Sequence, residues 1–239
     1  PNSNKKYPNG IFLFKANKNR LAGNFDYKDN QIIIENAKLR NSFLDGGFDG
    51  VIKFLPFFDF DLNVDLKGIN FNKFNSFFVS LNKENLFNIS NKINGRINLS
   101  VNKIYSKYNL IESFESRIRL VNSNISIEQL LLNLGKLGAA DITGLIKNDK
   151  KFINFKFENN IFIDNSKRFY SKFGIYNKKN SPSNLFVKGN LDLLNLVMRF
   201  QEISTDQKLN KEDLVYIEDE FNNTVLKDGY KSFFSYLQF

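Results

Sequence analysis

The chain has 239 residues, of which 42% are hydrophobic and 25% charged, and its formal charge is +9 at pH 7. These proportions are typical of a folded protein with a sizeable core, arranged as one large or two modest domains. Histidine, cysteine and tryptophan are absent, which excludes disulfides, thiol nucleophiles and the imidazole group that most often serves as zinc ligand or general base.

The strand patterns begin near the N-terminus as a meander. Residues 11–14, 23–27 and 32–39 read as short strands, with a turn over 28–30. Glycines punctuate residues 46–50, and residues 51–66 read as further extended structure with Pro56 at a bend, bulge or edge. Because the loops between these strands are short, we expect neighbouring strands to be antiparallel.

The clearest strand pattern is a strict alternation over residues 58–66. Asp59, Asp61, Asn63 and Asp65 fall on one side, and apolar residues fall on the other. The next strands along the chain repeat the alternation at residues 97–102 and 125–132. Ten residues are therefore candidates for an apolar surface: Phe58, Phe60, Leu62, Val64, Leu66, Ile97, Leu99, Val101, Ile125 and Ile127.

Helical patterns interrupt the strands in three places. Phe74, Phe77, Phe78 and Leu81 have helical spacing and predict a short helix over 73–81. A second short helix is expected over 166–173, and the best helix candidate is 212–226, with Gly229 ending or kinking it. The remaining segments are expected as strands, namely residues 117–121, 136–146, 152–163, 185–187 and 191–200.

An internal sequence repeat divides the chain into units. Ile32, Ile34 and Glu35 match Ile125, Ile127 and Glu128 at an offset of 93, and Gly50 matches Gly144 at an offset of 94. We therefore expect a first β-meander unit over 1–92, a second over 93–200, and a helical, truncated C-terminal segment over 201–239. The fold class is mainly β, a twisted and curved antiparallel sheet that could form an open groove, with a helix-rich C-terminus.

None of the motifs that resemble a chemical site is complete. Residues 61–65 begin like a calcium loop, but Leu66 occupies the position that requires glycine. Asp59, Asp61 and Asp65 are expected to face water, which does not suit paired catalytic carboxylates. The glycines at 46–50 lack the ending of a phosphate loop and suit a tight turn or bulge. We expect a non-enzymatic protein with no catalytic residue, metal or cofactor.

The positive charge would suit nucleic acid or anionic lipid headgroups. However, the lysines are scattered and the aromatic residues lie on the apolar side of the strands, so no nucleic-acid partner is expected. Asn, Lys, Ile and Phe, whose codons are AT-rich, are all frequent, so genome composition accounts for much of the lysine excess.

No run of eighteen or more apolar residues predicts a membrane-spanning helix. The chain starts at Pro1 without a basic and apolar leader, and residues 233–239 form a cluster of large apolar groups. Both ends therefore suggest a processed form or a piece of a longer protein.

Two regions resemble the C-terminal part of AsmA-like proteins of Gram-negative bacteria. The resemblance rests on GNFDY at 23–27, III at 32–34, LDGGFDG at 44–50, LVNSNISI at 120–127 and AADITGLI at 139–146. It implies a periplasmic, β-rich body held at the inner membrane by a helical anchor that this chain lacks. It also implies a lipid-lined groove that serves phospholipid transport, outer-membrane assembly and integrity, without catalytic residues.

The expected function is therefore to bind or transfer phospholipid acyl chains on the apolar side of the sheet. The alternative is a scaffold or protein-interaction domain in cell-envelope assembly, in which the helices at Phe74 and Glu212 cover that side completely. An enzyme would instead require a buried cluster of Asp, Lys, Tyr or Ser, which the spacing of these residues does not reveal.

Overall fold

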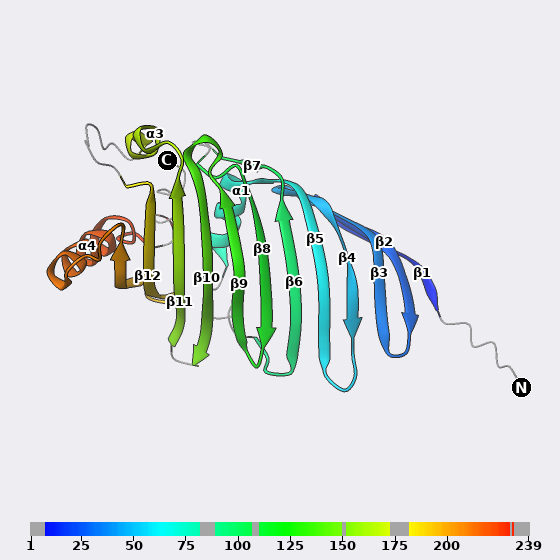
Figure 1. Ribbon diagram of the computed structural model, residues 1–239. Helices are drawn as coiled ribbons and strands as arrows, with labels where there is room; N and C mark the ends of the chain where they lie inside the picture. The colour runs from blue at the N-terminus through cyan, green and yellow to red at the C-terminus, as the bar shows by residue number, and fades with distance from the viewer. Residues whose placement is uncertain are drawn as a thin grey trace, which may run out of the picture.

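The computed structural model describes residues 8–81, 89–106, 110–149, 152–172, 182–229 and 231. Within them, thirteen strands form one sheet, and three α-helices lie beside it (Figure 1). The first strands are β1 (Asn9–Ala16), β2 (Asn19–Lys28), β3 (Gln31–Arg40), β4 (Leu44–Lys53), β5 (Phe58–Asn70), β6 (Ile93–Val101) and β7 (Ile104–Tyr105). The others are β8 (Ser113–Val121), β9 (Asn124–Asn133), β10 (Gly138–Asp149), β11 (Phe152–Ile163), β12 (Asn184–Asp192) and β13 (Val197–Ser204). The helices are α1 (Phe71–Ser80), α3 (Ser166–Lys172) and α4 (Lys211–Thr224), and a 3₁₀ turn, η1 (Gly135–Leu137), precedes β10.

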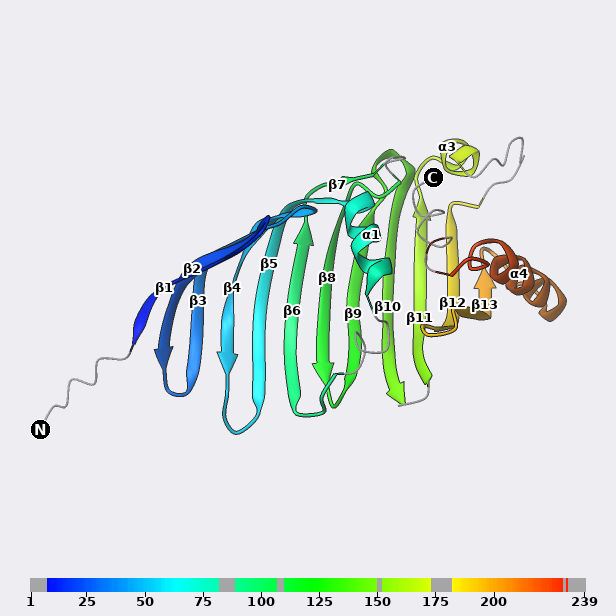
Figure 2. The same cartoon turned by 180° about the vertical axis from the view of Figure 1, so that it is seen from behind.

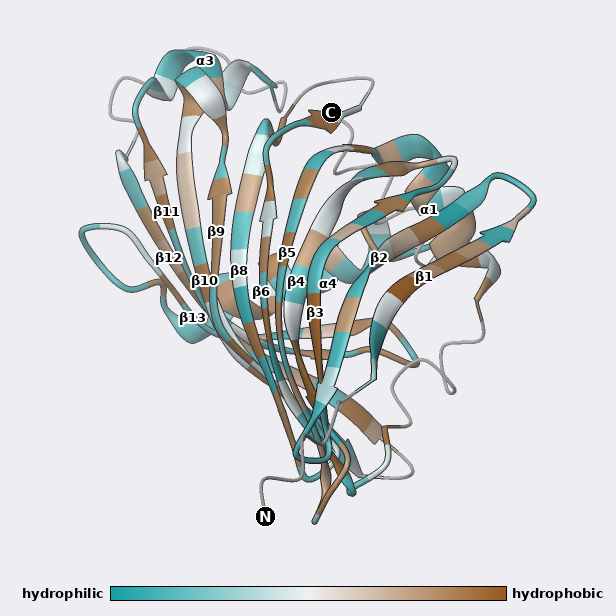
Figure 3. Ribbon diagram, turned by 90° about the vertical axis from the view of Figure 1, so that its right-hand side faces the viewer, coloured by the Kyte–Doolittle hydropathy of each residue, from teal (hydrophilic) through white to brown (hydrophobic). Residues whose placement is uncertain are grey.

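The strands follow one another across the sheet almost in chain order. Their order is β1-β2-β3-β4-β5-β6-β8-β9-β10-β11-β12-β13, and the short β7 also pairs with β5. The sheet is twisted and curved, and its two ends do not meet (Figure 3). The predicted mainly β fold with a curved, open and mostly antiparallel sheet is confirmed.

One pair of neighbours breaks the antiparallel rule. β5 and β6 are parallel, and α1 lies between them in the chain. A parallel pair needs a crossover, since both strands must start at the same end of the sheet. The helical pattern over 73–81 therefore also marks the place where the antiparallel order of the strands is interrupted.

The two segments that repeat in the sequence occupy equivalent places in the sheet. Ile34 pairs with Gly50 between β3 and β4, and Ile127 pairs with Gly144 between β9 and β10. The register shifts immediately beyond each pair, as a β-bulge requires. Each segment also begins with a two-residue turn of positive φ, at Asp29 and Asn30 before β3 and at Asn122 and Ser123 before β9. Such turns match the twist of a hairpin, and Asn, Asp and Ser tolerate them.

Three sequence expectations about the later elements are wrong. Residues 191–200 are not one strand, because 193–196 form a turn in which Asp192 Oδ1 accepts hydrogen bonds from the backbone N–H groups of Leu194 and Asn195. The strand expected from residue 136 starts at Gly138, after η1. The C-terminus is not helix-rich. Among the described residues, α4 is the one helix near it, and the strand β13 reaches Ser204.

The two outer edges of the sheet differ in whether another element covers them. At the β13 edge, α4 packs alongside and its Glu218 and Asn222 side chains bond the outward backbone groups of Phe200 and Met198. At the β1 edge, Ile11 and Leu13 are 79% and 58% exposed. One edge is therefore covered within the described part of the chain and the other is open.

Candidate apolar binding face

The strands bring the apolar residues of β5 and β6 together in register. Leu62 lies opposite Ile97, Val64 opposite Leu99, and Leu66 opposite Val101. Residues directly opposite each other in a sheet point to the same face. The alternation that each strand shows alone thus becomes a shared apolar surface, which we call the apolar face.

The apolar face continues across the whole sheet in both directions. From Ile97 it passes through β8 and β9 and reaches β13, and from Phe60 it passes through β4 and β3 to β2 and β1. Figure 3 shows the corresponding alternation of hydrophobic and hydrophilic residues along the strands. Besides the ten residues expected from the sequence, the registers place on this face Phe12, Phe25, Ile34, Phe48, Ile52, Ile118, Leu130, Ile146, Phe155, Phe157 and Phe200.

Phenylalanine rings on this face lie over glycines of the next strand. A Cβ built on Gly95 would come within 2.5 Å of the Phe60 ring, and one on Gly23 within 2.7 Å of the Phe12 ring. The same relation joins Phe25 to Gly10, Phe155 to Gly144 and Phe157 to Gly189. A ring placed over a glycine lies along the sheet instead of standing up from it, so the surface has low relief.

The ten candidate residues do not all remain accessible. Leu66 and Val101 are 4% and 1% exposed, because they form a core cluster with Ile104. Phe58, at the other end of the same strand, is 37% exposed. The structure therefore places Leu66 and Val101 in the protein core, and only the other candidates can contact a ligand.

The three helices lie on the apolar side and cover parts of it. α4 packs on the β11 to β13 end, where Phe221, Val225 and Leu226 contact the cluster around Leu191 and Met198. α3 contributes Phe169 to a cluster near η1. α1 lies over the middle of the sheet, in front of β8 and β9 (Figure 2), and each of its ten residues keeps some exposure. Among the described residues, the helices thus cover parts of the apolar face and leave other parts open.

A cavity of about 300 Å³ lies between α1 and the sheet. Phe71 and Phe74 of α1 line one side, and strand residues such as Leu99, Ile127 and Leu130 line the floor. Ser116 of β8 is the polar exception among its lining residues. It is 7% exposed, and its hydroxyl has no hydrogen-bond partner in the described part of the chain.

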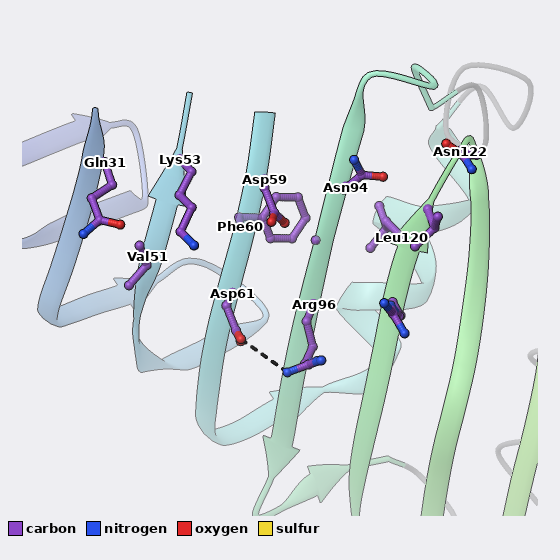
Figure 4. Close-up of a pocket in the computed structure, with 13 residues that line it drawn as sticks. Gln31, Val51, Lys53, Asp59, Phe60, Asp61, Asn94, Arg96, Leu120 and Asn122 are labelled. Carbon is purple, nitrogen blue, oxygen red and sulfur yellow. Dashed lines mark ion pairs between the residues drawn. The ribbon is translucent and has the colours of Figure 1, made fainter. Parts of the chain in front are cut away.

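The opposite face of the sheet is polar and is also hollowed. A cavity of about 700 Å³ spans β3 to β8, and Figure 4 shows the residues around it. Arg96 and Asp61 form an ion pair of 3.5 Å there, with both side chains about half exposed. Such exposed pairs contribute little stability, and they leave the carboxylates in contact with water.

Cross-strand hydrogen bonds join several other polar residues of this face. Asn98 Nδ2 donates to Asn63 Oδ1 over 2.8 Å, and the Ser100 hydroxyl donates to Asp65 Oδ1 over 2.5 Å. Further along, Glu158 accepts from Lys188 Nζ over 2.7 Å and raises the pKa of that amine. Among the described residues, no group of three His, Cys, Asp or Glu side chains comes together as metal ligands. The polar face is thus an exposed hydrogen-bonded surface.

Sequence reasoning did not single out Ser116, although a signal was present. In the alternation of β8, Phe114 and Ile118 fall on the apolar side, and Ser116 lies between them on that side. A polar residue at an apolar position of a two-faced strand marks either a small packing residue or a ligand contact. Phe12 and Phe25 were also missed, because the short strands around them carry weaker alternation.

No family model, characterised protein or solved structure matches the chain. No helix among the described residues is long and apolar enough to cross a membrane. The fold and its surfaces define an open, two-faced β-sheet protein with one continuous apolar face.

Proposed function

We propose that this protein binds phospholipid acyl chains along its apolar face and assists their transfer without performing chemistry. The observation that carries the proposal is the continuity of the apolar face across neighbouring strands from β1 to β13, with helices over only parts of it. A soluble protein rarely leaves a large contiguous apolar surface without a use. A hydrocarbon chain is the ligand that such a surface suits, since burial of each methylene contributes about 0.8 kcal/mol without any directed contact.

The low relief of the face also supports this function. Where Phe60 lies over Gly95, the ring covers the backbone of the neighbouring strand. A surface of this kind favours binding without strong preference for one position, which would allow a chain to move along the sheet. The resemblance to AsmA-like proteins points in the same direction, toward a periplasmic protein of the Gram-negative envelope that supports outer-membrane integrity.

A matched pair of variants tests the proposal. Leu62→Asp places a charge on the apolar face, and Asn63→Asp places the same charge on the neighbouring residue of β5, which faces the polar side. Native mass spectrometry should detect phospholipid with the wild type and Asn63→Asp, and less with folded Leu62→Asp. Transfer of fluorescent phospholipid between vesicles should fall in the same order. Absence of bound phospholipid from the wild type, or equal transfer by both variants, would contradict the proposal.

The scaffold function is the second candidate, and the packing of α4 favours it. Val215 and Tyr216 on the outer side of α4 are 59% and 67% exposed, which suits a protein contact. On this alternative the helices close enough of the apolar face to exclude lipid, so Leu62→Asp would leave vesicle transfer at background while Tyr216→Lys would weaken envelope assembly.

A further inference from the structure

The end of the hairpin between β4 and β5 consists of large apolar residues that face solvent. Its five residues, all exposed, are Phe54, Leu55, Pro56, Phe57 and Phe58, and we call them the apolar tip. Leu55 and Phe57 are 65% and 62% exposed. Hairpin turns are normally built from Gly, Asn, Asp and other polar residues, and the neighbouring β2–β3 turn, with Asp29 and Asn30, follows that rule. Turn chemistry therefore does not explain the composition of the apolar tip.

The apolar tip is continuous with the apolar face. The Phe54 ring contacts the Phe58 ring edge-on with centroids 6.0 Å apart, and Phe58 contacts Phe60 in the same way at 6.2 Å. Phe60 lies on the apolar face over Gly95. A row of aromatic rings thus leads from the exposed end of the hairpin into the proposed lipid-binding surface.

The apolar tip lies at the end of the sheet, and charged side chains lie directly behind it. In Figures 1 and 2 the β4–β5 connection reaches lower than the turns on either side. Lys53 and Asp59 lie opposite each other where the apolar run stops. Lys92 precedes Ile93, which pairs with Phe58, and all three charged side chains are exposed. Apolar groups at the outermost point with charges behind them match the hydrocarbon and headgroup layers of a bilayer.

We propose that the apolar tip inserts into the surface of a phospholipid bilayer and is the point at which acyl chains pass between the membrane and the apolar face. Its size favours a bilayer over a protein partner, because five residues fall well short of the roughly 20–30 that each side of a stable protein interface contributes. Fluid hydrocarbon also accommodates a projecting tip without a matching pocket. The proposal rests on lipid binding by the apolar face and adds to it the membrane partner and the entry point.

Two double variants of the same residue types test docking. Leu55→Ser with Phe57→Ser alters the apolar tip, and Leu13→Ser with Phe14→Ser alters a pair on the β1 edge that is 58% and 60% exposed. We expect the tip variant to bind vesicles of phosphatidylethanolamine and phosphatidylglycerol about tenfold to a hundredfold more weakly than the wild type, because two apolar side chains no longer enter the hydrocarbon. The edge variant should bind like the wild type. Co-sedimentation measures binding, and circular dichroism verifies that each variant is folded.

A tryptophan reporter measures insertion directly, since the chain contains no tryptophan of its own. The emission of Phe57→Trp should move to shorter wavelength when the vesicles are added, and brominated acyl chains should quench it. Tyr105→Trp is the control, because Tyr105 is 52% exposed and pairs with Asn70 at the opposite end of β5. Its emission should show neither change.

The outcomes separate this proposal from the proposed function. Equal vesicle binding by the tip and edge variants, or an unquenched Phe57→Trp, would overturn docking at the tip, while phospholipid bound to the wild type in native mass spectrometry would leave the function of the apolar face standing. A wild type that carries no phospholipid but binds vesicles through the tip would overturn that function and support docking. Failure of the wild type to sediment with vesicles would overturn docking, as expected if the tip contacts a protein instead.

Discussion

The side-chain amide of Asn222 in α4 takes the place of a neighbouring strand for Met198 in β13. Its Oδ1 accepts from the Met198 backbone N–H over 2.8 Å, and its Nδ2 donates to the Met198 carbonyl over 2.9 Å. Glu218, one helical turn earlier, accepts from the Phe200 N–H over 2.9 Å. Three outward backbone groups of the last strand are therefore satisfied by a helix, which opposes the addition of a further strand at this part of the edge.

Removing this amide should weaken the fold. We expect Asn222→Leu to lower the free energy of unfolding by about 1–3 kcal/mol, because the Met198 N–H and carbonyl groups lose partners in a half-buried position. Urea denaturation monitored by circular dichroism measures the change. The adjacent Asn223 is exposed, so Asn223→Ala should leave the midpoint nearly unchanged, and an equal loss in both variants would argue against edge capping.

The contact between Phe60 and Gly95 should show a coupling that depends on the ring. Gly95→Ala introduces a Cβ within 2.5 Å of ring atoms, and we expect it to cost about 1–3 kcal/mol through overpacking. In a Phe60→Ala background the same substitution should cost much less, because the ring is gone. A double-mutant cycle by denaturant unfolding gives the coupling energy, and additive effects would show that the ring can move aside freely.

The open β1 edge should make this polypeptide prone to self-association. Leu13 is 58% exposed on β1, the outermost strand of the sheet within the described residues. Leu13→Lys should raise the concentration at which light scattering begins, since a charged side chain on an edge opposes strand addition. Val215→Lys is the matched control, since Val215 is 59% exposed on α4. Equal improvement by both variants would mean that general surface polarity, not the edge, limits solubility.

Acid should destabilise the turn between β12 and β13. Burial raises the pKa of Asp192, but the hydrogen bonds from Asn195 and Leu194 outweigh it, so the pKa in the folded state lies below the ordinary value of 3.8. The carboxylate therefore stabilises the fold fully above the unfolded pKa, and this stability is lost as the pH falls from about 3.8 through the lower folded pKa.

The Asp192→Asn variant tests this pH dependence. It should be less stable than the wild type at pH 7, and the difference should narrow below pH 4 in urea titrations. The exposed Asp206 serves as the control, and Asp206→Asn should track the wild type at every pH. A constant gap between wild type and Asp192→Asn from pH 7 to pH 2 would contradict the assignment.

The sequence by itself determined most of the elements and the two faces of the strands. The alternation from Phe58 to Leu66 predicts a strand with one apolar side, and that strand is β5. The spacing of Phe74 and Phe78 likewise predicts a helix, which is α1. Such patterns are readable because side-chain direction follows from the local backbone with a period of 2 or 3.6 residues.

Only the tertiary structure decided which neighbours these elements meet. The parallel pairing of β5 with β6, the burial of Leu66 and Val101, and the cavity beneath α1 depend on how the chain returns after α1. These features arise from contacts between residues distant in the sequence, so no local period records them. For the same reason, the alternation within each strand predicts an apolar face. Only the assembled sheet shows that this face continues from strand to strand and that helices cover parts of it.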